Sequence, residues 1–242
     1  LLYVFFLMFN AFIFYKFING DDMKTIKMAF ASMFLIISSY ASAVEVSGNV
    51  ALSSDYIWRG MTQTQGDLSV NGGFDVSTDM GFYIGTWASN AGGTGTDYSM
   101  ELDVYLGFSG EMAENMTYDV GYISVIYPGD NSADFEEAYI AFNFYGLNIL
   151  YSDGQNDSPD YAEVGYSVDA GPGSFSISYG DYDGVGENSL IGYDWGVGNF
   201  TVGFYYYDFE AEVAANDDDG AYVSIGYSMS VSYTHLTLPT TD

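Results

Sequence analysis

The sequence predicts an all-β protein, a transmembrane up-and-down antiparallel β-barrel of about 12 strands, and three observations support this fold. Apolar and polar side chains alternate in successive segments of roughly ten residues, the period of a strand with two unlike faces. The connections between these segments are alternately short and long, as when neighbouring strands meet at the two ends of a barrel. Aromatic residues make up 19% of the chain, which suits the Tyr and Trp girdles of membrane barrels.

The segment 98–110 shows which face of a strand would meet lipid. Leu102 and Val104 are apolar, and Glu101 and Asp103 lie between and beside them. Turning both carboxylates toward lipid would cost roughly 2 kcal/mol or more near the midplane of the membrane. We therefore expect the carboxylates in the lumen and the apolar side chains outside.

The remaining segments follow in order along the chain. We expect the strands at 46–58, 68–77, 82–90, 98–110, 117–127, 135–145, 147–151 and 161–169, and around 175–179, 191–195, 200–206 and 223–229. The short connections are 78–81, 111–115, 146, 170–173 and 198–199, and the long ones are 60–67, 91–97, 128–134, 152–160, 180–188 and 209–220. This rhythm favours a barrel over a secreted soluble β-sandwich, whose crossovers have no reason to alternate. It also places both ends of the barrel on the periplasmic side.

The two ends of the sequence differ from the rest in composition and residue pattern. Residues 23–43 have a positive start, an apolar core and an Ala-Ser-Ala cleavage site, which predicts a secretory signal peptide. We interpret residues 1–22 as spurious upstream translation. Residues 231–242 resemble a translated sequencing adapter. The predicted outer-membrane barrel is then 44–230.

Composition excludes several classes of function. The chain has 33 acidic and 4 basic residues and a formal charge of −29, so it has no cationic surface for nucleic acid. The absence of Cys removes disulfides and thiolate chemistry. The one His, His235, lies in the suspected adapter, so we predict that the protein is not an enzyme and needs no cofactor or metal.

Several stretches carry a family resemblance. The run from Ser47 to Thr64 reads SGNVALSSDYIWRGMTQT, and it is followed by GGFD at 72–75, WASN at 87–90 and ELD at 101–103. These stretches resemble the TorF family of proposed porins, a conserved outer-membrane family, over residues 44–230. The resemblance implies a β-barrel in the outer membrane of a Gram-negative bacterium, with membrane lipid and small ions or solutes as its partners.

The candidate site is the wall of the lumen. Arg59 shares strand parity with Asp55, so both should point inward, either as a charged constriction or as a structural ion pair. Inward carboxylates could form a wall that attracts cations, or simply be solvated in a water-filled interior. The candidate residues are Asp55, Arg59, Asp75, Glu101, Asp103, Asp119, Glu137, Glu163 and Asp194.

The sequence thus predicts a porin-like channel for passive diffusion of small solutes, preferring cations. The alternative is a non-conducting structural or adhesive surface barrel. Two weaker features stay open: the acidic loops 153–160 and 216–220 could bind Ca²⁺ or merely be solvated, and Tyr205 and Tyr207 could form a stacking track or pack the rim.

Overall fold

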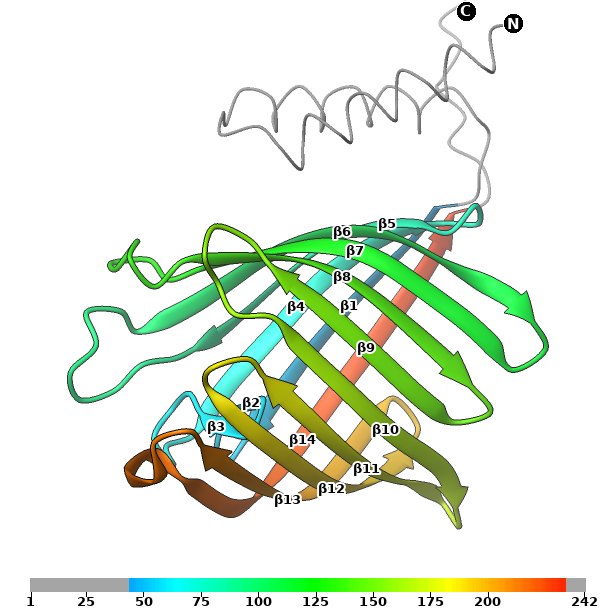
Figure 1. Ribbon diagram of the computed structural model, residues 1–242. Helices are drawn as coiled ribbons and strands as arrows, with labels where there is room; N and C mark the ends of the chain where they lie inside the picture. Colours follow the sequence, from blue (N-terminus) through cyan, green and yellow to red (C-terminus); the bar gives the residue numbers. More distant parts are fainter. Residues whose placement is uncertain (1–43, 234–242) are drawn as a thin grey trace, which may run out of the picture. The chain divides into compact units, whose positions relative to one another are not determined.

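The computed structural model describes residues 44–233, which form one closed barrel of antiparallel strands (Figure 1). The predicted upstream segment 1–22, the predicted signal peptide 23–43 and residues 234–242, with His235, lie outside the described residues. Within 44–233 no helix is long and apolar enough to cross a membrane. The twelve-stranded barrel confirms the predicted fold class, and this part of the chain does not contain the two stacked sheets of a sandwich.

Twelve strands form the wall, and two short ones, β2 and β3, form a separate hairpin. The wall strands are β1 (Val44–Ser53), β4 (Ser69–Thr78), β5 (Phe82–Asn90), β6 (Met100–Ala113), β7 (Met116–Ile126), β8 (Phe135–Phe144), β9 (Leu147–Gly154), β10 (Tyr161–Ala170), β11 (Gly173–Tyr182), β12 (Gly186–Val197), β13 (Phe200–Ala211) and β14 (Asp218–Tyr233). A 3-10 turn, η1 (Ala214–Asn216), precedes β14.

The barrel closes between the first and the last strand. β1 pairs with β4 on one side and with β14 on the other, so that Val44 lies opposite both Thr78 and Tyr233. β14 therefore extends three residues past the predicted barrel boundary at 230, and residues 231–233 pair with β1. That boundary was wrong because the alternation of β14 continues into the suspected adapter.

The two faces of the wall differ in exposure. Phe142 and Val164 are 40% and 46% exposed on the outer surface, whereas Glu101 and Glu137 are 4% and 3% exposed inside. Because these positions alternate along β6, β8 and β10, the structure confirms the predicted register of the three strands. A row of exposed Val, Ile, Leu and aromatic side chains surrounds the barrel, and no sheet edge is left open.

The predicted first strand 46–58 is wrong at its end. β1 stops at Ser53, and residues 54–68, which we call the inner loop, leave the wall and fold into the lumen. The loop contains the hairpin of β2 (Ile57–Trp58) and β3 (Met61–Thr62), which pairs separately from the wall and is labelled at the lower left of Figure 1. Its turn is made by Arg59 and Gly60, with φ of 48° and 78°, in the left-handed region that ends an extended strand.

Two predicted long loops are shorter than expected. β11 and β12 are joined by residues 183–185 rather than 180–188, and β13 and β14 by 212–217 rather than 209–220. Acidic residues in these segments still alternate within paired strands, as where Asp181 lies opposite Glu187. A strand beyond the apolar band can carry charge on both faces, so polarity alone did not mark its end.

Candidate functional site in the barrel lumen

Arg59 lies at the tip of the inner loop and binds the opposite wall. The prediction that it shares a strand with Asp55 is wrong, because β1 has already ended. Its Nη1 and Nη2 atoms each donate to one carboxylate oxygen of Glu137 on β8, both at 2.7 Å. The two side chains are 8% and 4% exposed. A bidentate, largely desolvated pair of this kind fixes both direction and distance.

Aromatic rings surround the guanidinium. Its Cζ atom lies 4.0 Å from the ring centre of Tyr161 on β10 and 4.9 Å from that of Tyr182 on β11. Trp58, the neighbouring loop residue, lies 4.3 Å from the same atom and packs edge-on against Tyr182. The predicted strand 46–58 would have put Trp58 in the wall, but the residue lies in the inner loop instead. The tip of the loop is held against three wall strands by one ion pair and by cation–π contacts.

Asp55 closes the base of the inner loop. Its Oδ1 atom accepts hydrogen bonds from the hydroxyls of Thr62 and Thr64, both at 2.7 Å. The backbone N–H of Tyr56 donates to Thr64 Oγ1 at 3.0 Å. Asp55 is thus buried in a turn-forming network. It was predicted to face the lumen from a wall strand, but it lies in the inner loop and its partners are loop residues.

Tyr56 connects the loop to a second part of the wall. Its hydroxyl donates to Glu101 Oε1 at 2.6 Å, and Tyr127 donates to Oε2 of the same carboxylate at 2.7 Å. Burial, and then the Glu101 charge, raise the pKa of both phenols well above the usual value. Both phenols therefore stay protonated and act as donors at neutral pH. The Tyr56 ring also packs edge-on against Trp87 on β5.

The loop is tightly fitted against the remaining strands. A Cβ atom added at Gly60 would lie 2.7 Å from Asn188 Cβ on β12 and 3.0 Å from Phe209 Cβ on β13. The inner loop therefore touches the wall from β5 to β13. The wall positions at this level, including Ser69, Asn188 and Phe209, are buried. This section of the lumen is packed with side chains.

Tyrosine hydroxyls partner most of the other predicted lumen carboxylates, which composition alone did not reveal. Tyr side chains at inward positions lie across or along the wall from each acid. The pairs are Tyr105 with Asp75 (2.6 Å), Tyr83 with Asp119 (2.6 Å), Tyr161 with Glu163 (2.9 Å) and Tyr205 with Asp194. Each of these carboxylates accepts a hydrogen bond from a neutral phenol, and none of the four forms an ion pair in the described part of the chain.

Asp103 differs from the other acids. It is 9% exposed, and its buried Oδ1 atom has no hydrogen-bond partner. It lies two residues from Glu101 on the same inward face of β6. The predicted lumen acids therefore divide into three kinds. Glu137 is paired with a cation, most of the others accept hydrogen bonds from hydroxyl groups, and Asp103 has one oxygen without a hydrogen-bond partner.

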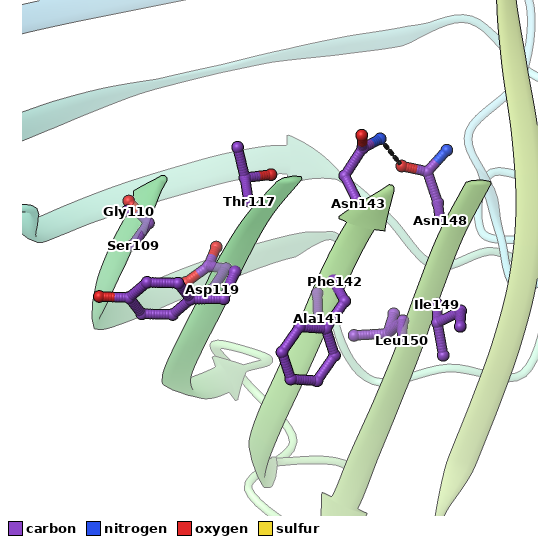
Figure 2. A pocket seen from close by; sticks show the side chains of 11 residues that line it. Ser109, Gly110, Thr117, Asp119, Ala141, Phe142, Asn143, Asn148, Ile149 and Leu150 are labelled. Carbon is purple, nitrogen blue, oxygen red and sulfur yellow. Dashed lines mark hydrogen bonds between the residues drawn. The ribbon is translucent and has the colours of Figure 1, made fainter. Parts of the chain in front are cut away.

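On the side of the inner loop that faces the short turns, the lumen contains a hollow. Strands β6 to β9 line a pocket of about 450 Å³, with polar side chains from Thr117, Asp119, Asn143 and Asn148 (Figure 2). Asn143 Nδ2 donates to Asn148 Oδ1 at 2.6 Å across the β8–β9 hairpin. Open space lined by both polar and apolar side chains therefore lies on one side of the packed section.

The structure bears on the two weaker candidates, the tyrosine pair of β13 and the acidic loops. Tyr205 stacks on Tyr222 with ring centres 4.6 Å apart, and Tyr207 is 5% exposed. Tyr207 therefore has no free face for a solute, and packing is the favoured interpretation for it. Within residues 44–233, no group of three or more His, Cys, Asp or Glu side chains is arranged to hold a metal.

Comparison with known proteins identifies a family. The model of a bacterial protein family of unknown function, Gcw_chp, matches residues 38–239. The chain belongs to the Gcw_chp family. The name of the matching family model is not TorF, the family that the sequence was said to resemble. The findings show membership of the Gcw_chp family and a porin-like barrel fold. No curated protein matches the chain in sequence.

Solved structures share the fold of this Gcw_chp barrel. The KdgM porin is similar with a TM-score of 0.56 and 7% identity, over 76% of this chain and 99% of that one. A KdgM porin in complex with disordered oligogalacturonate gives a TM-score of 0.54 at the same identity and coverage. At such low identity the likeness shows a common porin-like architecture and nothing of the lumen chemistry.

Proposed function

We propose that this protein is an outer-membrane channel for the passive diffusion of small solutes, that it prefers cations, and that the inner loop sets its narrowest section. One observation carries the proposal: the inner loop is fastened across the lumen by the Arg59–Glu137 pair. A barrel that served only as a wall would not require a loop anchored to its far side.

The membrane location is supported by the outer surface. Exposed apolar side chains alternate with inward polar ones on every side of the barrel, and closure satisfies the backbone without free edges. In a Gram-negative bacterium this surface would contact outer-membrane lipid. The likeness to the KdgM porin agrees with this location.

The preference for cations is supported by the charges of the lumen. Arg59 is the one basic side chain among residues 44–233, and Glu137 already neutralises it. Glu101 and Asp103 lie beside the packed section without a cationic partner. Because screening limits the reach of a charge to about 8 Å at physiological salt, acids at the narrow section dominate selectivity.

A non-conducting barrel is the second candidate, and the packed lumen at the level of the inner loop favours it. In that case the loop would be a permanent plug. We further propose that the protein has no catalytic activity. Residues 44–233 contain neither His nor Cys to serve as a base or thiolate, which supports this proposal.

The test is the reversal potential of single channels in a planar bilayer across a salt gradient. The wild type should prefer cations, and Glu101→Gln with Asp103→Asn should move the reversal potential toward zero. Glu114→Gln with Glu212→Gln removes two charges at exposed connections and should leave it unchanged. Anion preference in the wild type would reject the selectivity, and no conductance under any condition would favour the structural barrel.

A further inference from the structure

We propose that the wall pocket, formed by Glu137, Tyr161 and Tyr182, is a binding site for a guanidinium group, and that Arg59 occupies it as an internal ligand. Free solutes that carry a guanidinium group would then be ligands of the same pocket and would compete with the inner loop. The inference deepens the proposed channel function by naming a solute class. The binding itself does not depend on conduction.

The shape of the wall pocket matches a guanidinium rather than a cation in general. Both Glu137 oxygens accept from different nitrogens of one planar group, each at 2.7 Å. The Tyr161 and Tyr182 rings lie 4.0 and 4.9 Å from the central carbon. A fork of two parallel donors with aromatic faces beside it suits guanidinium, whereas an ammonium group can supply only a point charge.

The wall pocket is built by strands, not by the loop that fills it. Glu137, Tyr161 and Tyr182 belong to β8, β10 and β11. Tyr161 donates to Glu163 at 2.9 Å, and its ring meets that of Tyr182 edge-on at 5.9 Å. These contacts lie within the wall and would remain if the loop moved away. The pocket is therefore preorganised for an incoming ligand.

An empty wall pocket would leave the Glu137 carboxylate without a counter-charge. Glu137 is 3% exposed, and Arg59 is the one basic residue among 44–233 that could pair with it. Withdrawal of the loop would uncover Glu137 and remove its one cationic partner, so a cation that enters the pocket could pair with it. A guanidinium solute would form the same two hydrogen bonds with Glu137 that Arg59 forms.

The inner loop is a competitor that can be displaced. Arg59 and Gly60, with φ of 48° and 78°, form the two-residue turn of the β2–β3 hairpin, which is paired within itself and could leave the wall as a unit. Tethering raises the effective concentration of the Arg59 guanidinium, in the millimolar range for short linkers, so a free ligand must approach such levels to compete. Displacement would loosen the packed section from the wall at the same time.

The test is calorimetric titration of the purified barrel in detergent micelles with methylguanidinium and, separately, with methylammonium. In Arg59→Ala the pocket is vacant, and methylguanidinium should bind saturably, at least tenfold more tightly than methylammonium. The wild type should bind methylguanidinium at least tenfold more weakly than Arg59→Ala. Adding Glu137→Gln to Arg59→Ala should abolish binding, whereas adding Asp119→Asn, a lumen acid elsewhere, should preserve it.

Equal binding of both cations, binding that survives Glu137→Gln, or no binding to Arg59→Ala would each overturn the inference. If Arg59→Ala does not fold, Arg59→Gln takes its place under the same criteria, because glutamine keeps a polar side chain at the tip but removes the cation that competes for Glu137. Since the titration is made in micelles, a missing conductance in bilayers would reject the channel and leave the binding result standing.

Discussion

Arg59 and Glu137 form a pair in which each residue depends on the other. Both side chains are largely withdrawn from water and joined by two hydrogen bonds. Removing one partner leaves the other charged and buried, which costs more than removing both. The pair therefore stabilises the inner loop chiefly by making its release unfavourable.

Arg59→Ala should lower the free energy of unfolding by about 3 kcal/mol, because Glu137 is left unpaired. The double variant with Glu137→Gln should lose clearly less than the single one. Urea unfolding in micelles, followed by tryptophan fluorescence, measures both. A double variant as unstable as the two single variants added together would show that the pair is not coupled.

Tyr56→Phe isolates one hydrogen bond between the inner loop and the wall. Glu101 would lose one of its two phenol donors, and the free energy of unfolding should fall by about 1.5 kcal/mol, as for hydrogen bonds to charged groups. Tyr166→Phe removes a hydroxyl from the exposed outer face of β10 and serves as the control. The same unfolding measurement should show less than about 0.5 kcal/mol for the control. Equal effects of the two variants would contradict the assigned bond.

At the scale of the elements, the inner loop shows where sequence reasoning reached its limit. Alternation continues through Tyr56 and Trp58, so the pattern alone could not show that β1 ends at Ser53. The turn signal was Arg59-Gly60, and the two threonines that bind Asp55 follow it. Whether such a segment folds inward depends on contacts with distant strands, which one sequence does not reveal.

The lumen carboxylates were predicted from strand parity, and most of their hydrogen-bond partners were missed. Tyr83, Tyr105 and Tyr205 lie at inward positions, so their presence in the lumen could have been predicted. Which tyrosine meets which acid depends on the register between strands and on the stagger of the barrel. Those quantities follow from closure, as in the pairing of β1 with β14, and not from any single segment.

Gly60→Ala tests how closely the inner loop fits the lumen. A Cβ at this position would lie 2.7 Å from Asn188 and would also strain a backbone with φ of 78°, so the tip should move from the wall. Single-channel conductance should rise severalfold. Gly66→Ala is a matched control in the same loop, since its φ is 80° but no atom lies within 4 Å. A conductance that is unchanged in Gly60→Ala, or raised equally in Gly66→Ala, would show that the tip does not limit passage.

At the scale of the whole molecule, the barrel combines an apolar exterior, a polar interior and one packed level. The exterior and the strand number follow directly from alternation and turn rhythm, because both are local properties of the chain. The packed level arises because a long connection turns inward instead of outward. A short hollow lined by β6 to β9 remains beyond it.

Closure between β1 and β14 makes this barrel a candidate for circular permutation. Val44 and Tyr233 lie opposite each other in the seam, so a few glycines could join them without disturbing the wall. New ends can be opened in residues 212–217, all of which are exposed. The permuted chain, which would start with β14 and finish with β13, should refold with unchanged far-ultraviolet circular dichroism. Failure to refold would indicate that the order of the strands along the chain, and not only their pairing, determines assembly.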